Sequence, residues 1–77
     1  MYILDRSTSE QAAKSLKDLR NCSRKVNGFG DEAFGCYKDG KLLNIIFRSN
    51  QYVIGVDGPS EDVVRRFARY IDVEIRK

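Results

Sequence analysis

The chain has 77 residues, with 14 Lys and Arg, 11 Asp and Glu, and no histidine, so its net charge is +3. This length allows one domain, and the 42% hydrophobic content is too high for intrinsic disorder. No stretch has the roughly 18 apolar residues of a membrane span, and the first six residues lack the apolar core of a signal peptide. We expect residues 1–77 to form a single α+β domain.

The N-terminal part predicts a brief strand followed by a helix. The strand is expected at the apolar run of residues 2–4. Ser7 and Glu10 have the Ser-x-x-Glu spacing of a capping box, so the helix is expected to start at Ser7. It is expected to end near Asn21. The apolar residues that recur at helical spacing are Ala12, Ala13, Leu16 and Leu19.

The middle of the chain predicts an antiparallel meander. Residues 22–32 show no period and contain glycines and an asparagine, which indicates a loop. Asp39-Gly40 is a strong hairpin signal, because a type I′ turn needs positive φ at both central residues. Ser49-Asn50 indicates a second tight turn. The predicted strands cover residues 33–38, 41–48 and 51–56.

The C-terminal part predicts an amphipathic helix that closes the domain. Ser60 is a favourable N-cap, and Glu61 and Asp62 suit the positive end of a helix dipole. Arg76-Lys77 places positive charge at the opposite end. The expected order is therefore β-α-β-β-β-α, with both helices packed on one face of the sheet. The core-facing residues of this helix are Val64, Phe67, Ala68, Ile71 and Ile75.

The central strand of the meander is apolar on both faces. Because side chains alternate along a strand, Leu42 and Ile46 are expected to point away from the helices. Self-association, most simply a two-fold homodimer, or another protein domain would bury them. Alternatively, the glycine-rich loop covers them with Val26 and Phe29. The residues on the opposite face are Leu43, Ile45 and Phe47.

Cys22 and Cys36 allow one pairing. A disulfide between them would tie the end of the first helix to the first meander strand. The alternative is that both are small buried hydrophobes. A structural zinc site needs four sulfur or imidazole ligands, so we expect no metal.

The sequence offers little for catalysis. The commonest general base is absent, since the chain has no histidine. Asp31 and Glu32 are adjacent carboxylates in a loop and are expected to diverge into water rather than face a common substrate. Residues 28–33 match G-x-G-x-x-A, but a dinucleotide site needs a strand before that motif and a helix after it. We expect a protein that is not an enzyme and binds no cofactor.

RNA binding is the alternative function. The helix, three strands and helix, with Gly58-Pro59-Ser60 before the last helix, resemble a double-stranded-RNA-binding domain. Glu61 and Asp62 occupy the place where such domains hold phosphates with lysines, so binding is expected to be weak or absent. The candidate contacts are Lys14, Lys17, Arg65, Arg66 and Arg69.

The most distinctive string is Gly-Phe-Gly-Asp-Glu-Ala-Phe, at residues 28–34. With the strand ending in Arg48, the polar turn at Asn50, the Val/Ile-rich strand and the last helix, it resembles an uncharacterised module of archaeal and bacterial surface lipoproteins and other extracytoplasmic proteins. The resemblance covers residues 28–75. It implies a non-catalytic accessory or interaction module of a cell-envelope protein. Longer members carry a signal or lipid anchor and often a second half, and we expect neither within residues 1–77.

The residues of this string predict a structural turn. Gly28 and Gly30 permit positive φ or close packing, and Phe29 and Phe34 are expected in the core. The two carboxylates after Gly30 are expected to accept backbone N–H bonds and shape the entry into the meander. The predicted turn comprises Gly28, Phe29, Gly30, Asp31 and Glu32.

Overall fold

The computed structural model describes residues 1–20 and 22–76. In these residues, five strands form one antiparallel sheet in the order β1-β5-β4-β3-β2. The α+β class and the antiparallel meander are confirmed, and β2 is an addition in a segment expected to be a loop. The elements are β1 (Tyr2–Asp5), α1 (Ser9–Leu19), β2 (Arg24–Lys25), β3 (Glu32–Lys38), β4 (Lys41–Ser49), β5 (Tyr52–Asp57) and α2 (Glu61–Ile75).

The hairpin turns follow the local sequence closely. Asp39 and Gly40 have φ angles of 53° and 77°, as a type I′ turn between β3 and β4 requires. The next turn lies one residue later than expected, at Asn50 and Gln51, and Asn50 has a φ of 55°. Asparagine tolerates this left-handed conformation better than most residues.

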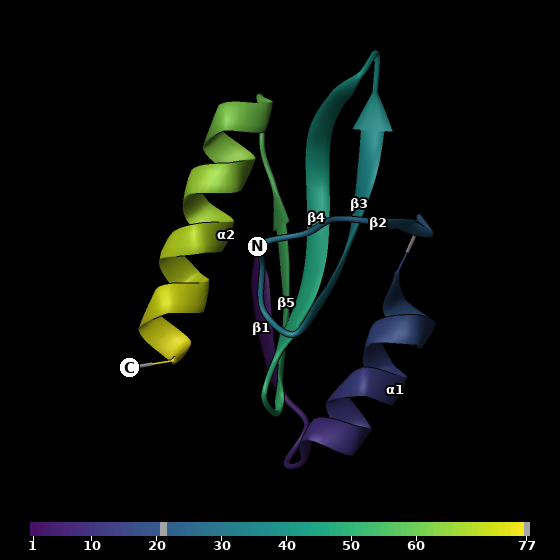
Figure 1. Ribbon diagram of the computed structural model, residues 1–77, viewed down its shortest axis with the longest axis vertical. Coiled ribbons are helices and arrows are strands. Elements are labelled where there is room, and N and C mark those ends of the chain that lie inside the picture. The colour runs from purple at the N-terminus through teal and green to yellow at the C-terminus, as the bar shows by residue number, and fades with distance from the viewer. Residues whose placement is uncertain (21, 77) are drawn as a thin grey trace.

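The helices pack on opposite faces of the sheet, whereas the sequence favoured one shared face (Figure 1). α2 covers the face that carries Ile45, Phe47 and Ile54. On the other face, α1 packs Ala12 and Leu16 against the sheet. Because β4 carries apolar side chains on both faces, each face can pack against one helix. The sheet residues on the α1 face are Phe34, Ile46 and Val53.

A β-bulge changes the direction of Leu42. Cys36 pairs with Asn44, but Tyr37 pairs with Leu42, so Leu43 is the extra residue on β4. Leu42 therefore shares the α2 face with Ile45 and Phe47, instead of pointing away with Ile46. The loop residues Val26 and Phe29 lie in the same cluster as Leu42.

This arrangement corrects the predicted self-association site. Leu42 and Ile46 are 0% and 5% exposed, and they belong to different cores. Leu42 lies under the loop and α2, whereas Ile46 lies under α1. The two residues form no surface that a second copy could reach.

The helix caps agree with the sequence in part. Ser60 caps α2 by accepting a hydrogen bond from the Val63 N–H. The N-cap of α1 is Thr8, which accepts from the Gln11 N–H at 3.1 Å, and not Ser7. Ser7 has a φ of 73°, and its N–H donates to Asp5 Oδ1.

Two apolar residues that were assigned to the core are exposed. Leu19, the last residue of α1, is 43% exposed, and Phe67 of α2 is 53% exposed. Phe67 lies on the flank of α2 rather than beneath it. Asn21, the expected end of the first helix, and Lys77, the expected end of the second, lie outside the described residues.

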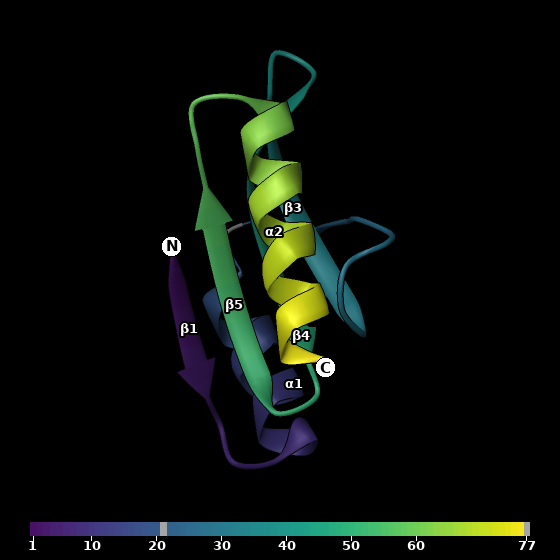
Figure 2. The ribbon, with the colours of Figure 1, turned by 90° about the vertical axis from the view of Figure 1, so that its left-hand side faces the viewer.

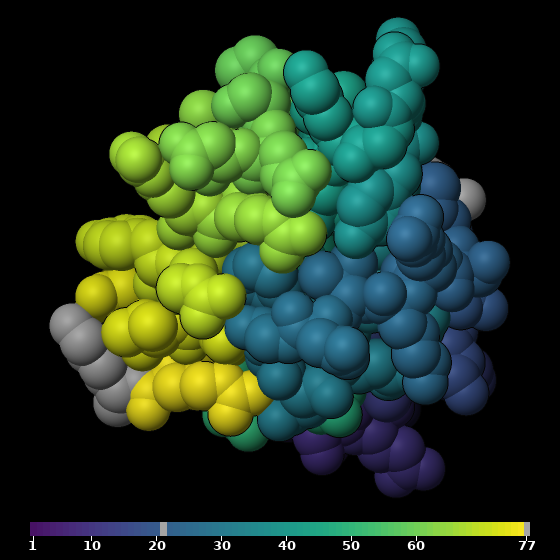
Figure 3. All heavy atoms as spheres, turned by 45° about the horizontal axis from the view of Figure 1, so that its top comes forward, coloured from purple at the N-terminus to yellow at the C-terminus, as the bar shows by residue number. Residues whose placement is uncertain are grey.

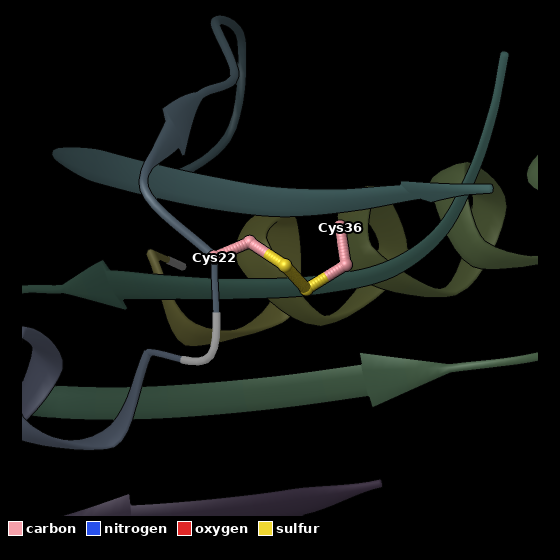
Figure 4. The surroundings of a disulfide bond; sticks show 2 residues. All are labelled: Cys22 and Cys36. Carbon is pink, nitrogen blue, oxygen red and sulfur yellow. A yellow bond between two sulfur atoms is a disulfide. The ribbon is translucent and has the colours of Figure 1, made fainter.

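Cys22 and Cys36 form a disulfide, which is the pairing raised from the sequence (Figure 4). It joins the segment after α1 to the middle of β3. The chain then joins the edge of the sheet as β2, which pairs antiparallel with Gly35 and Phe34 of β3. The disulfide thereby holds the connection between α1 and the sheet.

Candidate functional site

The glycine-rich turn fits between β4 and the end of α2 (Figure 3). Gly28 and Gly30 have φ angles of 94° and 54°, as expected for their positions. A Cβ atom at Gly30 would lie 2.2 Å from the Arg48 carbonyl oxygen, so only glycine fits there. The Gly30 N–H donates to Asp72 Oδ2, and the Asp31 N–H donates to the Arg48 carbonyl.

Asp31 joins three parts of the chain. Its carboxylate accepts hydrogen bonds from Arg76 at 2.9 Å, from the Asn50 N–H at 2.9 Å and from Arg48 at 3.2 Å. The bond from Arg76 and the Asn50 N–H hold the pKa of Asp31 below its usual range. The predicted role of this carboxylate as a backbone acceptor is confirmed. Glu32 begins β3 opposite Arg48.

The phenylalanines of this string lie in the core, as expected, but in different clusters. Phe29 packs with Phe47 on the α2 face, and Phe34 packs on the α1 face. Each ring also carries a guanidinium group on its outer side. Arg69 lies 5.1 Å from the Phe29 ring centre, and Arg20 lies 4.6 Å from that of Phe34. The turn therefore serves the fold.

The carboxylate of Glu61 also accepts hydrogen bonds, which join the start of α2 to β4. Glu61 accepts from the Leu42 N–H at 3.0 Å and from Arg65 Nε at 2.8 Å. The Leu42 bond, followed by that from Arg65, lowers the pKa of Glu61. Within residues 1–20 and 22–76, no three His, Cys, Asp or Glu residues are grouped to hold a metal ion.

The candidate RNA contacts do not form one surface. Lys14 and Lys17 lie on α1, whereas the arginines lie on α2, across the sheet. The arginines also have partners within α2 or the loop: Arg65 pairs with Glu61, Arg66 pairs with Asp62, and Arg69 covers Phe29. A duplex docked on one face of the domain would meet one cluster and miss the other.

The two edge strands of the sheet differ in length and in charge. β2 forms one edge with Arg24 and Lys25, a short and charged strand of the type that prevents pairing with other chains. β1 forms the other edge with the sequence Tyr-Ile-Leu-Asp. Figure 2 shows β1 beside β5, with its outer side open and α2 lying over β4. The β1 edge is longer than the β2 edge and carries three apolar residues.

The backbone of β1 presents hydrogen-bonding groups to solvent. The Arg6 N–H donates to the Gln51 carbonyl, so Arg6 points its polar groups toward the β5 side. In an antiparallel ladder, alternate residues point in opposite directions. Leu4 and Tyr2 therefore also point inward, whereas the N–H and C=O groups of Ile3 and Asp5 point outward.

Apolar side chains of β1 surround this open edge. Ile3 lies opposite Ile54 on the α2 face, but it is 48% exposed because α2 lies over β4. Tyr2 lies on the α1 face and is 42% exposed. Its ring covers Gly55, where a Cβ atom would come within 2.3 Å of the ring. Partial burial raises the pKa of Tyr2.

The flank of α2 on the β5 side of the sheet carries three apolar residues. Val63, Phe67 and Tyr70 follow one another at i, i+4 and i+7 and line a groove of about 550 Å³ with Arg66. The opposite flank of α2 binds the loop and β4 through Glu61, Asp72 and Arg76. Because that flank faces the loop, the flank with Val63 and Phe67 faces away from the loop.

We call the open edge of β1 and these neighbouring apolar side chains the β1-edge surface. The sequence does not reveal this surface, because each of its residues, taken alone, also fits a core position. The i, i+4, i+7 spacing on α2, offset from the buried stripe, was the available signal. The side chains of the β1-edge surface are Tyr2, Ile3, Val63, Phe67 and Tyr70.

No family model, curated protein or solved structure matches the chain. In the described part of the chain, neither helix is long and apolar enough to cross a membrane.

Proposed function

We propose that the protein is a non-catalytic protein-interaction module that binds through the β1-edge surface. The observation that carries the proposal is the contrast between the edges of the sheet. β2 exposes Arg24 and Lys25 at its edge, whereas β1 exposes Tyr2 and Ile3 beside an unpaired backbone. Proteins normally protect such edges unless the edge is used.

Strand addition is the binding mode that this surface fits. An extended segment alongside β1 would bond to the outward groups of Ile3 and Asp5, which supply main-chain affinity. Side chains on one face of that segment would meet Ile3 and the apolar flank of α2. The added strand could come from a second copy of the chain or from another protein domain.

The polar residues support a binding role rather than catalysis. The carboxylates of Asp31 and Glu61 accept hydrogen bonds from arginines and from backbone N–H groups, which hold the turn and the start of α2 in place. They point to different partners and not to a common substrate position. These bonds favour a structural role for both groups.

A cell-envelope location forms part of the proposal. Disulfides persist mainly in oxidising compartments, and the Cys22–Cys36 disulfide fits such a compartment. The resemblance of residues 28–75 to a module of surface lipoproteins supports the same location. The interaction module would then act on the outer side of a membrane as a part of the envelope.

Selection of peptides from a phage-displayed library of random linear peptides tests the proposal. Peptides that bind the protein are expected to have alternating apolar residues and to lose at least tenfold in affinity for Ile3→Lys, because a buried charge at this position opposes docking. Leu19→Lys is the matched control, since Leu19 is a similarly exposed apolar residue on α1. Selected peptides that bind wild type and Ile3→Lys equally would refute the proposal.

A further inference from the structure

We infer that the strand bound at the β1-edge surface is β1 of a second copy, paired antiparallel with Leu4 on a two-fold axis. This inference rests on the proposed function, because it names the partner of the same surface.

The backbone of β1 is complementary to itself in this register. The outward N–H and C=O groups belong to Ile3 and Asp5, two residues apart. When two copies run antiparallel about Leu4, Ile3 of each copy lies opposite Asp5 of the other. In each of these pairs, Ile3 and Asp5 donate one main-chain hydrogen bond to each other. The two-fold axis generates a second, identical pair on the other side of Leu4. All the outward groups of β1 are then satisfied.

On the α1 face, the side chains of the two β1 strands are complementary in the same register. Leu4 is partly buried against the cluster of Ala12 and Leu16. At the axis it meets Leu4 of the second copy, so the α1-side cores of both copies become continuous. Tyr2 lies opposite Arg6 of the second copy, where a guanidinium group can stack on the exposed ring. These contacts cover apolar surface that the single chain leaves open.

The side chains on the α2 face are compatible as well. Ile3 lies opposite Asp5 of the second copy, whose carboxylate already accepts bonds from the Ser7 N–H and from Gln51. These bonds direct the carboxylate toward its own chain and away from Ile3. The two Ile3 side chains then lie on either side of the axis.

The spacing of the helices leaves room for this dimer. α2 lies over β4, two strands from the edge, so five strand spacings of about 4.8 Å separate the two α2 axes by roughly 24 Å. Since a helix with side chains has a radius of about 5–6 Å, a gap of roughly 12–14 Å remains. Phe67, which is 53% exposed, lies on the flank of α2 that would border this gap.

The opposite edge does not support the same pairing. Two copies joined at β2 would bring Arg24 and Lys25 of each chain together, and like charges on facing strands repel. Arg24 is also held over the Tyr37 ring at 4.3 Å. Of the two sheet edges in residues 1–20 and 22–76, the β1 edge is the one that offers a self-complementary strand.

Cysteine cross-linking tests the register. In a non-hydrogen-bonded antiparallel pair the Cα atoms lie about 4.5 Å apart, within the range of a disulfide. Leu4→Cys on the axis should therefore form a linked dimer under mild oxidation with the native disulfide intact. Ile3→Cys is the matched control, because diagonal neighbours lie about 7–8 Å apart. Faster linking of Ile3→Cys than of Leu4→Cys would overturn the register.

Sedimentation equilibrium from micromolar to millimolar concentration tests the partner. The wild type is expected to pass from the 8.8 kDa chain to a dimer in this range, as a small interface implies. Ile3→Pro removes an outward donor that the monomer does not use, so it should raise the dissociation constant at least tenfold and keep the fold. A wild type that stays monomeric over the whole concentration range would overturn the inference that the bound strand belongs to a second copy. Binding of the selected peptides would then still support the proposed function. Failure of the dimer can therefore be distinguished from failure of the proposed function.

Discussion

The carboxylate of Asp31 lies 2.9 Å from the guanidinium group of Arg76, which is 45 residues later in the chain. The same carboxylate also holds Arg48 and the Asn50 N–H at the end of β4. The glycine-rich turn thus fixes the C-terminal end of α2 on the sheet. With this flank of α2 held against the loop, the opposite flank, with Phe67, faces outward.

Removal of the Asp31 charge should destabilise the domain. Asp31→Asn is expected to lower the free energy of unfolding by about 1–2 kcal/mol, because it weakens hydrogen bonds to charged partners at a partly exposed site. Urea unfolding followed by circular dichroism measures the change. Asp39→Asn is the control, since asparagine suits the same hairpin turn. Equal losses in the two variants would contradict the role of Asp31.

Stability should fall in acid because of the same group. The pKa of Asp31 is lower in the folded state, so its contribution is present above the unfolded pKa of about 3.9 and is lost as pH falls through the folded pKa. Glu61, whose pKa is also lowered, adds to the loss. Urea midpoints at about pH 7 and pH 3 test this, and Asp31→Asn should show a smaller decrease than wild type. An identical decrease in both proteins would count against the assignment.

Gly30 should tolerate substitution much less than Gly40. Both residues have positive φ, which costs alanine about 1–2 kcal/mol. A Cβ at Gly30 also collides with the Arg48 carbonyl, whereas a Cβ at Gly40 meets no atom within 4 Å. Overpacking adds about 1–3 kcal/mol, so Gly30→Ala is expected to cost about 2–5 kcal/mol in total. Similar unfolding free energies for the two alanine variants would show that the turn adjusts easily.

The disulfide should stabilise the fold. Cys22 and Cys36 are 14 residues apart, and a loop of this size corresponds to about 3 kcal/mol. Replacing both cysteines by serine should lower the unfolding free energy by that amount, as measured in urea. A reducing agent should destabilise the wild type and leave the double variant unchanged. A wild type insensitive to full reduction would refute this prediction.

The sequence predicted the features that depend on neighbouring residues. Asp39 and Gly40 determine their turn through their own φ preferences, and Ser60 caps α2 through a bond three residues away. Positive φ at Gly28 and Gly30 was likewise readable from residue type. These features require no knowledge of the rest of the fold.

The features that depend on distant contacts were not predictable in this way. Leu43 is the extra residue of a bulge, and this bulge moves Leu42 to the other face of the sheet. α1 occupies the face of Ile46, which the sequence left open for a partner. Phe67 fits the helical period of a core residue, but α2 is rotated so that its ring is exposed.

The β1-edge surface was hidden for the same reason. The apolar run of residues 2–4 correctly predicts a strand, but the sequence does not say that this strand lies at an edge. Strand order is a property of the whole sheet, and it determines whether Ile3 is covered or exposed. Only the position of α2 over β4 leaves that side chain open.

Amide hydrogen exchange at Ile3 and Asp5 tests the central claim, strand addition at β1, most directly. In dilute protein, these outward amides should exchange fast, while the inward amide of Leu4 is protected by β5. With a saturating amount of a selected library peptide, both outward amides should slow at least tenfold, because each gains a main-chain acceptor. Peptide binding that leaves both amides exchanging as fast as in the free protein would contradict the account.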